Sequence, residues 1–208
     1  MNDSNKYQDD QVTKKVYAPL FEKLDAFSAN DQAVIIGIDG NAGSGKSQLA
    51  NLLLDKYDCQ IFHMDDYFLP FEMKTKERLS EPGGNVHYER FLHEVMEPLK
   101  KGEVISYQPY DCQVRDYVNP VEVSPKKINI VEGVYSFHPV LQQFYDWKLF
   151  LQVHPDVQFE RIREREGEQK LQMFIDRWIP LENHYFEALE IKKLADMVID
   201  TSNLSSLQ

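Results

Sequence analysis

The segment Gly40-Asn-Ala-Gly-Ser-Gly-Lys-Ser47 constrains the fold of this chain more than any other feature. It fits the pattern G-x-x-x-x-G-K-[ST], in which glycines let the backbone turn so that several N–H groups approach phosphate oxygens. A short β-branched apolar run precedes it over 33–39, and apolar residues at helical spacing follow over 48–57. Strand, glycine loop and helix, in this order, are the context that a phosphate-binding P-loop requires.

Each fixed position of this loop has a predicted task. The loop leads into a helix N-terminus, which carries unpaired donors and a partial positive charge. Lys46 is expected to reach the β- and γ-phosphates, and the Ser47 hydroxyl to ligate Mg²⁺. The residues predicted to contact the nucleotide here are Gly40, Asn41, Ala42, Gly43, Ser44, Gly45, Lys46, Ser47 and Gln48.

Composition restricts the partners of the chain. Its 208 residues suit one domain over 1–208, and a net charge of −11 disfavours broad binding to nucleic acid or to anionic membranes. The N-terminus lacks the apolar core of a signal peptide, and no apolar run approaches the roughly 18 residues of a membrane span. Cys59 and Cys112 suggest no disulfide framework and fit a reducing cytoplasm. Whether the chain forms a homo-oligomer is left open.

The order of apolar runs predicts an α/β protein with a P-loop NTPase fold. Strands that alternate with helices imply a parallel five-stranded sheet with helices on both faces. The strands are expected over 33–39, 60–64, 128–131, 148–153 and 195–199, and the helices over 48–57, 88–99, 156–166 and 174–194. A further strand is expected over 103–109, and a small hairpin or irregular excursion over 116–127.

An amphipathic helix is expected at the start of the chain, over 12–27, with Pro19 disturbing its early part. It belongs to an N-terminal extension, residues 1–30, that would cover an edge or a face of the sheet. The stretch 69–85 contains two glycines and two prolines, which mark a long loop of the kind that often has a function.

Acidic residues follow two of the predicted strands. A P-loop needs an acidic group near Mg²⁺, and open α/β sheets place their ligands at the carboxyl ends of strands. Glu132 is predicted to serve the metal, and Asp65 to be the base that receives the proton of the acceptor, with a place near the metal as well. Asp66 is predicted to face the substrate, whereas Asp39 is expected to bond the loop.

Arginines on a late helix supply positive charge in an acidic chain. Arg161 and Arg165 are four residues apart and therefore share one helix face. They predict a phosphate-clamping lid over about 160–172, in which Arg165 has a catalytic part together with Lys46 and Asp65. The alternative is a solvated helix whose glutamates pair with these arginines.

Together these residues resemble the uridine kinase-like branch of P-loop kinases, which also includes nicotinamide riboside kinase, phosphoribulokinase and bacterial pantothenate kinase. The resemblance covers roughly 34–199 and is carried by His63-Met-Asp-Asp-Tyr-Phe68, Tyr110-Asp111, Ile130-Val-Glu-Gly133 and Ala195-Asp-Met-Val-Ile199. It implies ATP and Mg²⁺ as cofactors, Asp65 as base, Ser47 and Glu132 at the metal, and the lid arginines on phosphates. On the acceptor side Tyr110 matches an aromatic residue that lines the acceptor pocket in uridine kinases. The candidate acceptor residues of this chain are Asp66, Tyr67, His87, Tyr110 and Arg115.

The chain departs from this pattern on the acceptor side. His87 stands where such kinases have an aspartate that holds ribose hydroxyls, and Gln113, Val114 and Arg115 stand where uridine kinases carry a base-reading histidine. The lid after Arg165 also lacks the usual Gly-Arg-Asp stretch. These departures leave uridine open as the acceptor, and Arg115 would suit an acidic or phosphorylated one.

The sequence therefore predicts an ATP-dependent kinase that phosphorylates a hydroxyl of a small nucleoside-like metabolite. Two alternatives stay open: a nucleotide-binding regulatory module, and a kinase relative with another acceptor, such as a sugar, pantothenate or an acidic metabolite. A relative that binds metabolites without turnover is a third. The absence of an N-K-x-D motif from the sequence argues against a GTPase.

Overall fold

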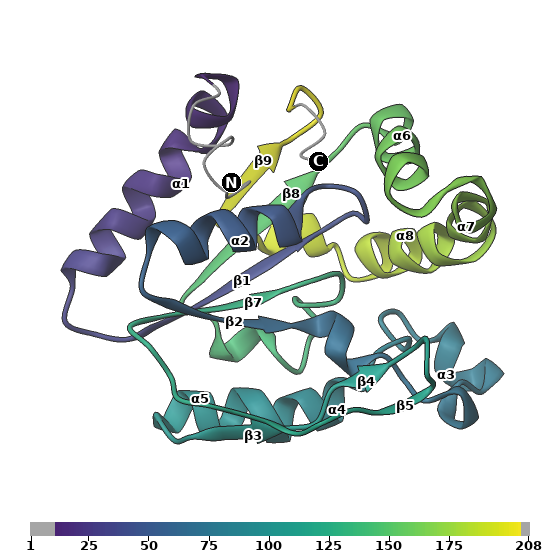
Figure 1. Ribbon diagram of the computed structural model, residues 1–208, viewed down its shortest axis with the longest axis horizontal. Coiled ribbons are helices and arrows are strands. Elements are labelled where there is room, and N and C mark those ends of the chain that lie inside the picture. Colours follow the sequence, from purple (N-terminus) through teal and green to yellow (C-terminus); the bar gives the residue numbers. More distant parts are fainter. Residues whose placement is uncertain (1–10, 205–208) are drawn as a thin grey trace.

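The computed structural model describes residues 11–204 (Figure 1). Its centre is a parallel five-stranded sheet, as the sequence predicts. The strands lie in the order β2 (Cys59–His63), β7 (Ile128–Glu132), β1 (Val34–Gly40), β8 (Trp147–Gln152) and β9 (Met197–Asp200). Because β1 and β7 are buried along their whole length, these β-branched runs have no polar alternation.

Helices cover both faces of the sheet, which confirms the predicted fold class. Alternate residues of β1 face opposite sides, so Ile35 packs in one cluster and Ile36 and Ile38 in the other. The second cluster is covered by α1 (Gln11–Ala29) and α2 (Lys46–Lys56). The first cluster is covered by the helical segment over 88–101 and by a late helix, α8 (Ile179–Ala188).

The N-terminal helix forms as predicted and continues through Pro19. Leu20 and Leu24 on its inner side are fully buried, and α1 lies beside α2 and β9 (Figure 1). Residues 1–10 of the predicted N-terminal extension lie outside the described residues. Within residues 11–204 there is no helix with both the length and the apolar character needed to cross a membrane.

Strand register brings three chain segments together at one end of the sheet. β2 pairs with β7 so that His63 lies opposite Glu132, and β1 pairs with β7 so that Ile38 lies opposite Glu132. The P-loop begins directly after this point of β1. The carboxyl ends of β1, β2 and β7 therefore meet where an open α/β sheet binds its ligands.

The segment between β2 and β7 forms a separate layer at the β2 side of the sheet (Figure 1). It begins with η2 (Met64–Tyr67), and the predicted long loop over 69–85 follows with two short helical turns, η3 (Phe71–Met73) and α3 (Lys76–Ser80). A continuous helical stretch follows, α4 (Tyr88–Phe91), a π-helical turn η4 (Leu92–Met96) and α5 (Glu97–Lys101), which ends at Gly102 in the left-handed conformation, φ 72°.

The short strands of this layer correct the sequence prediction. β3 (Ile105–Tyr107) forms as expected but pairs antiparallel with β6 (Val121–Val123), outside the main sheet. β4 (Tyr110–Asp111) pairs with β5 (Asp116–Tyr117), so of the two alternatives predicted for 116–127 the hairpin is wrong and the irregular excursion holds. Prolines at 120 and 125 flank β6, which leaves it to pair with an earlier strand.

The helix predicted over 174–194 is also broken. α6 (Pro155–Glu166) and α7 (Glu168–Met173) meet at Gly167, and a π-helical turn η6 (Phe174–Trp178) leads into α8. Pro180 lies in the first turn of α8, where its missing N–H is tolerated. A 3₁₀ turn, η7 (Ile191–Leu194), then leads towards β9; α6 to α8 stand to the right in Figure 1.

Candidate active site

The P-loop adopts the backbone geometry that its glycines allow. Gly43 and Gly45 have φ of 73° and 89°, in the left-handed region that side chains rarely occupy. The Lys46 ammonium is buried by the loop and donates to the carbonyls of Gly40 and Asn41 at 2.8 and 2.9 Å. The Ser44 hydroxyl is buried without a hydrogen-bond partner within the described residues. A cradle with a cation and a free donor suits phosphate oxygens.

Asp39 underpins this loop, as the sequence predicts. Its fully buried carboxylate accepts from the Gly40 N–H at 2.7 Å, from the Phe137 N–H at 2.9 Å and from the Tyr185 hydroxyl at 2.8 Å. Burial raises the pKa of Asp39 to about 6, against the lowering effect of these donors. The bonds join the end of β1 to the segment after β7 and to α8.

The outer face of the P-loop is held by side chains that sequence reasoning missed. Gln158 and Glu182 bond the Ala42 peptide, and the Thr201 hydroxyl donates to the Ser44 carbonyl at 2.9 Å. One signal was readable for Glu182, because Ile179, Glu182 and Tyr185 are spaced along one buried stripe of α8. Nothing local marks Gln158 or Thr201.

Arg161 differs from its predicted role on phosphate. Its guanidinium donates to the carbonyls of Gly43, Thr201 and Leu204 at 2.6–3.0 Å and to the Thr201 hydroxyl at 3.2 Å. These contacts occupy both terminal nitrogens, so Arg161 ties the P-loop to the segment after β9. Arg165, one turn further along α6, is exposed, and its one ion pair within residues 11–204 is with Glu166, at 2.9 Å.

Ser47 and Glu132, the predicted metal residues, lie in contact. The Ser47 hydroxyl donates to Glu132 Oε1 at 3.2 Å, and His63 Nδ1 lies 2.5 Å from the same oxygen. The hydrogen bond to Glu132 raises the pKa of His63. No group of three or more His, Cys, Asp or Glu side chains in the described part of the chain could hold an ion by itself. This sparse oxygen set fits Mg²⁺, which takes one or two protein ligands beside phosphates and water.

Asp65 lies at the turn directly after β2, near these groups. The residue is exposed to water although protein surrounds its carboxyl group densely. Desolvation, followed by the negative charge of Glu132, raises its pKa, while the nearby charges of Lys46, His63 and Arg165 oppose the rise. The structure thus brings Lys46 and Arg165, the other two predicted catalytic residues, within electrostatic reach of Asp65.

The 81–89 stretch, which runs from the end of α3 into α4, is fastened to the segment after Asp66. Main-chain hydrogen bonds run from Leu69 to Asn85 and from His87 to Tyr67, at 3.2 and 2.7 Å. Tyr135, just beyond Glu132, has φ 78° and bonds Asn85 through its side chain. A positive φ is strained for a bulky residue and is often found at functional sites.

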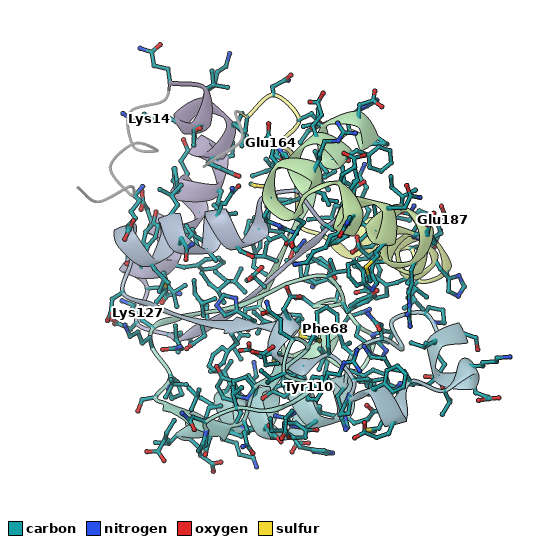
Figure 2. The ribbon with its side chains drawn as sticks, turned by 45° about the vertical axis from the view of Figure 1, so that its right-hand side comes forward. Lys14, Phe68, Tyr110, Lys127, Glu164 and Glu187 are labelled. Carbon is teal, nitrogen blue, oxygen red and sulfur yellow. The ribbon has the colours of Figure 1, made fainter. Side chains whose placement is uncertain are left out.

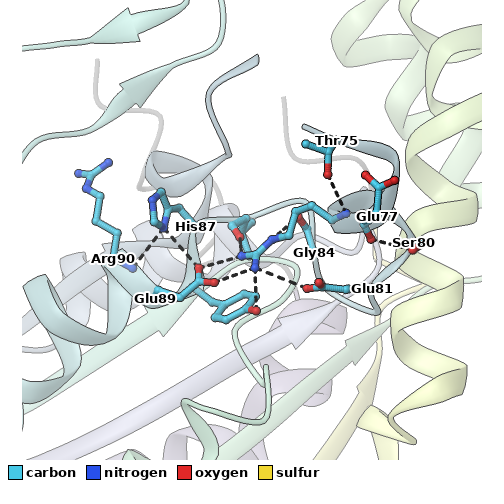
Figure 3. A network of polar contacts seen from close by, with 11 residues as sticks. Thr75, Glu77, Ser80, Glu81, Gly84, His87, Glu89 and Arg90 are labelled. Atoms are coloured by element: carbon cyan, nitrogen blue, oxygen red, sulfur yellow. Dashed lines mark hydrogen bonds and ion pairs between the residues drawn. The ribbon is translucent and has the colours of Figure 1, made fainter. Parts of the chain in front are cut away.

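Arg78 is the centre of a polar network on this stretch (Figure 3). Its guanidinium holds both Glu89 carboxylate oxygens, at 2.7 and 2.8 Å, and donates to the carbonyls of Gly84 and Val86 at 3.1 Å. It also lies over the ring of Tyr88, which stacks on His138 with centroids 3.8 Å apart. The 81–89 stretch is therefore shaped largely by one side chain.

The predicted acceptor residues have unlike environments. Tyr67 is 1% exposed, stacks in the core and donates to Glu94 at 3.1 Å, so its hydroxyl is engaged away from a substrate. His87 caps α4, since its Nδ1 accepts from the Arg90 N–H at 3.3 Å. The structure thus gives these two residues contacts within the protein, and their predicted contacts with a substrate stay predictions.

The other three predicted acceptor residues, Asp66, Tyr110 and Arg115, differ in their exposure. Asp66 is half-buried, and burial raises its pKa. Tyr110 is nearly buried and lies close to Phe68 in Figure 2. Arg115 is exposed at the turn between β4 and β5, with φ 57° and its guanidinium 6.0 Å from the centre of the Phe71 ring.

Comparison with known proteins gives this arrangement a family. No family model matches the chain. A uridine kinase of Clostridium novyi is 31% identical over 183 residues, which span 80% of this chain and 86% of that relative. The chain belongs to the uridine kinase family of P-loop kinases. A uridine kinase of Geobacillus kaustophilus is 26% identical over 188 residues, covering 80% of this chain and 85% of its own.

The fold of this uridine kinase family member agrees with a solved structure. A possible uridine kinase from Bacillus stearothermophilus superimposes with a TM-score of 0.69 over 90% of this chain and 98% of its own, at 23% identity. At that identity the likeness concerns the fold alone. The five-stranded parallel sheet and its helices are thus those of a P-loop kinase.

Proposed function

We propose that the protein is an ATP-dependent kinase that transfers the γ-phosphoryl group to a hydroxyl of a small nucleoside-like metabolite. The observation that carries the proposal is the position of Asp65 at the turn directly after β2, where the charges of the P-loop cation Lys46 and of the exposed lid residue Arg165 act on its carboxylate. A regulatory nucleotide-binding module has no need of a carboxylate at this place. Family membership supports a phosphotransferase.

The residues divide the reaction between them. Mg-ATP, when bound, would supply the phosphoryl group and a divalent charge that offsets the negative charge of the phosphates. The P-loop and Lys46 would hold the phosphates, and Ser47 and Glu132 the metal. The Asp65 carboxylate would take the proton of the acceptor hydroxyl. The hydroxyl oxygen would form a bond to the γ-phosphorus, while the bond from that phosphorus to the leaving oxygen of ADP breaks. A raised pKa makes Asp65 a better base for this step.

An acceptor with an acidic group is a second candidate, favoured by cations at the mouth of the acceptor side. Lys74 is half-buried, and no carboxylate pairs with it within the described residues. Burial, together with the nearby charge of Arg177, lowers the pKa of Lys74. Arg115 lies at the neighbouring turn between β4 and β5. Cations that have no acidic partner among the described residues suit a carboxylate or phosphate of a substrate.

The test is a screen for ADP release with Mg-ATP over nucleosides, pantothenate, sugars and sugar phosphates. We expect turnover with at least one hydroxyl acceptor that depends on Asp65. If wild-type protein binds Mg-ATP but no acceptor of any class raises ADP release above the rate with water, a regulatory module would be the better description. A preference for sugar phosphates over nucleosides would favour the acidic acceptor.

Both cysteines of the chain are free thiols, Cys59 buried and Cys112 exposed. Free thiols fit a reducing compartment, and we therefore place the protein in the cytoplasm.

A further inference from the structure

The Ala42 peptide of the P-loop is held at both of its polar ends by buried side chains. Its N–H donates to Glu182 Oε2 at 3.0 Å, and its carbonyl accepts from Gln158 Nε2 at 2.9 Å. Glu182 is 6% exposed and Gln158 is 4% exposed. Buried polar side chains that meet only one peptide leave that peptide little freedom. We name this pair of contacts the Ala42 clamp.

The two members of the Ala42 clamp come from the helices on either side of the predicted lid. Gln158 lies on α6 before it, and Glu182 on α8 after it. Ala42 also packs in a small apolar cluster with Ile162 and Leu171, from α6 and α7. The P-loop therefore touches the start, the middle and the end of the lid region.

The clamp and the lid cation share one rigid element. Gln158 and Arg165 are both on α6, which is unbroken between them. Seven residues of α-helix span about 10 Å, so the position of Gln158 fixes the backbone position from which the Arg165 side chain extends. A shift of the Ala42 peptide would move the phosphate cradle relative to Arg165.

We propose that Gln158 and Glu182 are positioning residues that hold the P-loop in register with the lid helix α6, so that the phosphate cradle and Arg165 address the same phosphoryl group. The proposal rests on the proposed function for the part played by Arg165. It assigns a task to two buried polar groups that take no part in proton transfer. Burial also raises the pKa of Glu182 to about 7, so its charge changes near neutral pH.

The first test needs no acceptor. Glu182→Leu and Gln158→Leu each remove one contact, whereas Glu182→Gln keeps an oxygen that can accept from the Ala42 N–H. Gln172→Leu is the matched control, since Gln172 is an exposed lid glutamine whose side chain bonds Asp176 on the next turn. We expect amide exchange of residues 42–45 in the free protein to quicken about tenfold or more, and the Kd for Mg-ATP by calorimetry to rise about tenfold, a change of ~1.4 kcal/mol. Glu182→Gln and Gln172→Leu should stay within about threefold of wild type.

The second test separates positioning from simple structural support. In a double-mutant cycle on ADP release, Arg165→Ala should cost at least about threefold less in the Gln158→Leu background than in wild type, because Arg165 is already out of register there. Unchanged exchange and Mg-ATP affinity in both leucine variants, or effects that multiply independently with Arg165→Ala, would overturn the proposal. A wild-type protein that binds no Mg-ATP would refute the proposed function. The amide exchange of residues 42–45 in the leucine variants would still test whether the Ala42 clamp holds the P-loop.

Discussion

The donor side and the acceptor side of this protein are built in different ways. The P-loop follows a buried central strand, and its shape is set by glycines in the left-handed region and by main-chain contacts to Lys46. The acceptor side, residues 64–123, has two small sheets of two strands each and is fastened by side chains such as Arg78 and Arg90. The donor side thus joins a backbone shape set by glycines to supporting side chains, whereas the acceptor side depends mainly on contacts between side chains.

This difference predicts that substitutions on the two sides separate in kinetics. Changes on the donor side should alter affinity for Mg-ATP, and changes on the acceptor side should alter acceptor KM. Asp65 lies at the boundary, because it is the first acidic residue after β2 and lies near Lys46. It is therefore the residue at which the comparison is tested most severely.

Asp65→Asn should have the largest effect. The amide cannot take the acceptor proton, so we expect kcat for acceptor-dependent ADP release to fall by about 10²–10⁴-fold. The Kd for Mg-ATP, measured by calorimetry, should stay within about threefold of wild type. Full turnover would remove Asp65 as base, and loss of Mg-ATP binding would assign it to the metal instead.

Arg78→Met should affect the acceptor side alone. It removes the contacts to Glu89, Gly84 and Val86 that shape the 81–89 stretch, and hydrogen bonds to charged groups contribute about 1.5–3 kcal/mol. We expect acceptor KM to rise about tenfold or more while the KM for Mg-ATP is unchanged, measured by initial rates. Equal increases in both constants would show that the two sides are not separate. Arg78→Lys keeps the positive charge but loses the planar guanidinium that bonds both Glu89 oxygens, so its acceptor KM should lie between those of wild type and Arg78→Met.

The stability of the donor side should depend on pH through Glu182 and Asp39. Their folded-state pKa values, about 7 and about 6, lie above the ordinary values of 4.5 and 3.8. The folded state therefore binds more protons, so stability is greatest below the ordinary values and is lost as pH rises towards 7. We expect Glu182→Gln to remove about 3 kcal/mol of the decline in unfolding free energy between pH 4.5 and 7, at 1.36 kcal/mol per pKa unit. Urea unfolding at several pH values measures it, and parallel curves for both proteins would contradict the prediction.

Arg115→Ala should have the smallest effect and concern acceptor choice. If the acceptor is acidic, its kcat/KM should fall at least about threefold relative to a neutral acceptor, and Lys74→Met should act in the same direction. Lys101→Ala, at the C-terminal end of α5, is a control for the loss of a surface cation. A change in preference below threefold would remove Arg115 from the acceptor side.

Predictions from the sequence succeeded where local pattern and position coincide. The five strands of the sheet lie close to their predicted ranges, because short β-branched apolar runs between polar turns are buried most readily as strands. The contact of Ser47 with Glu132 followed from the rule that parallel strands end at one edge. The roles of Ser47, Glu132, Asp65 and the lid over 160–172 stay predictions until they are measured.

Predictions failed where distant residues decide. β4 pairs with β5 and β3 with β6, and the sequence around 116–127 shows turns but not which earlier strand they return to. Arg161 has the helical spacing of a phosphate ligand, yet its guanidinium is engaged by carbonyls of the P-loop and of the segment after β9. No local pattern reveals such partners, because they are brought together only by folding.

By itself, the sequence determined that this chain has a phosphate-binding loop between a buried strand and a helix, with acidic residues at neighbouring strand ends. That much follows from the φ angles that glycine permits and from the two-residue and 3.6-residue periods of apolar burial. Tertiary structure alone decided which side chains support the loop: Glu182 lies 140 residues from Ala42, and Gln158 lies 116 residues from it. Buried polar groups must find partners wherever the fold places them, and that placement is a property of the packed chain.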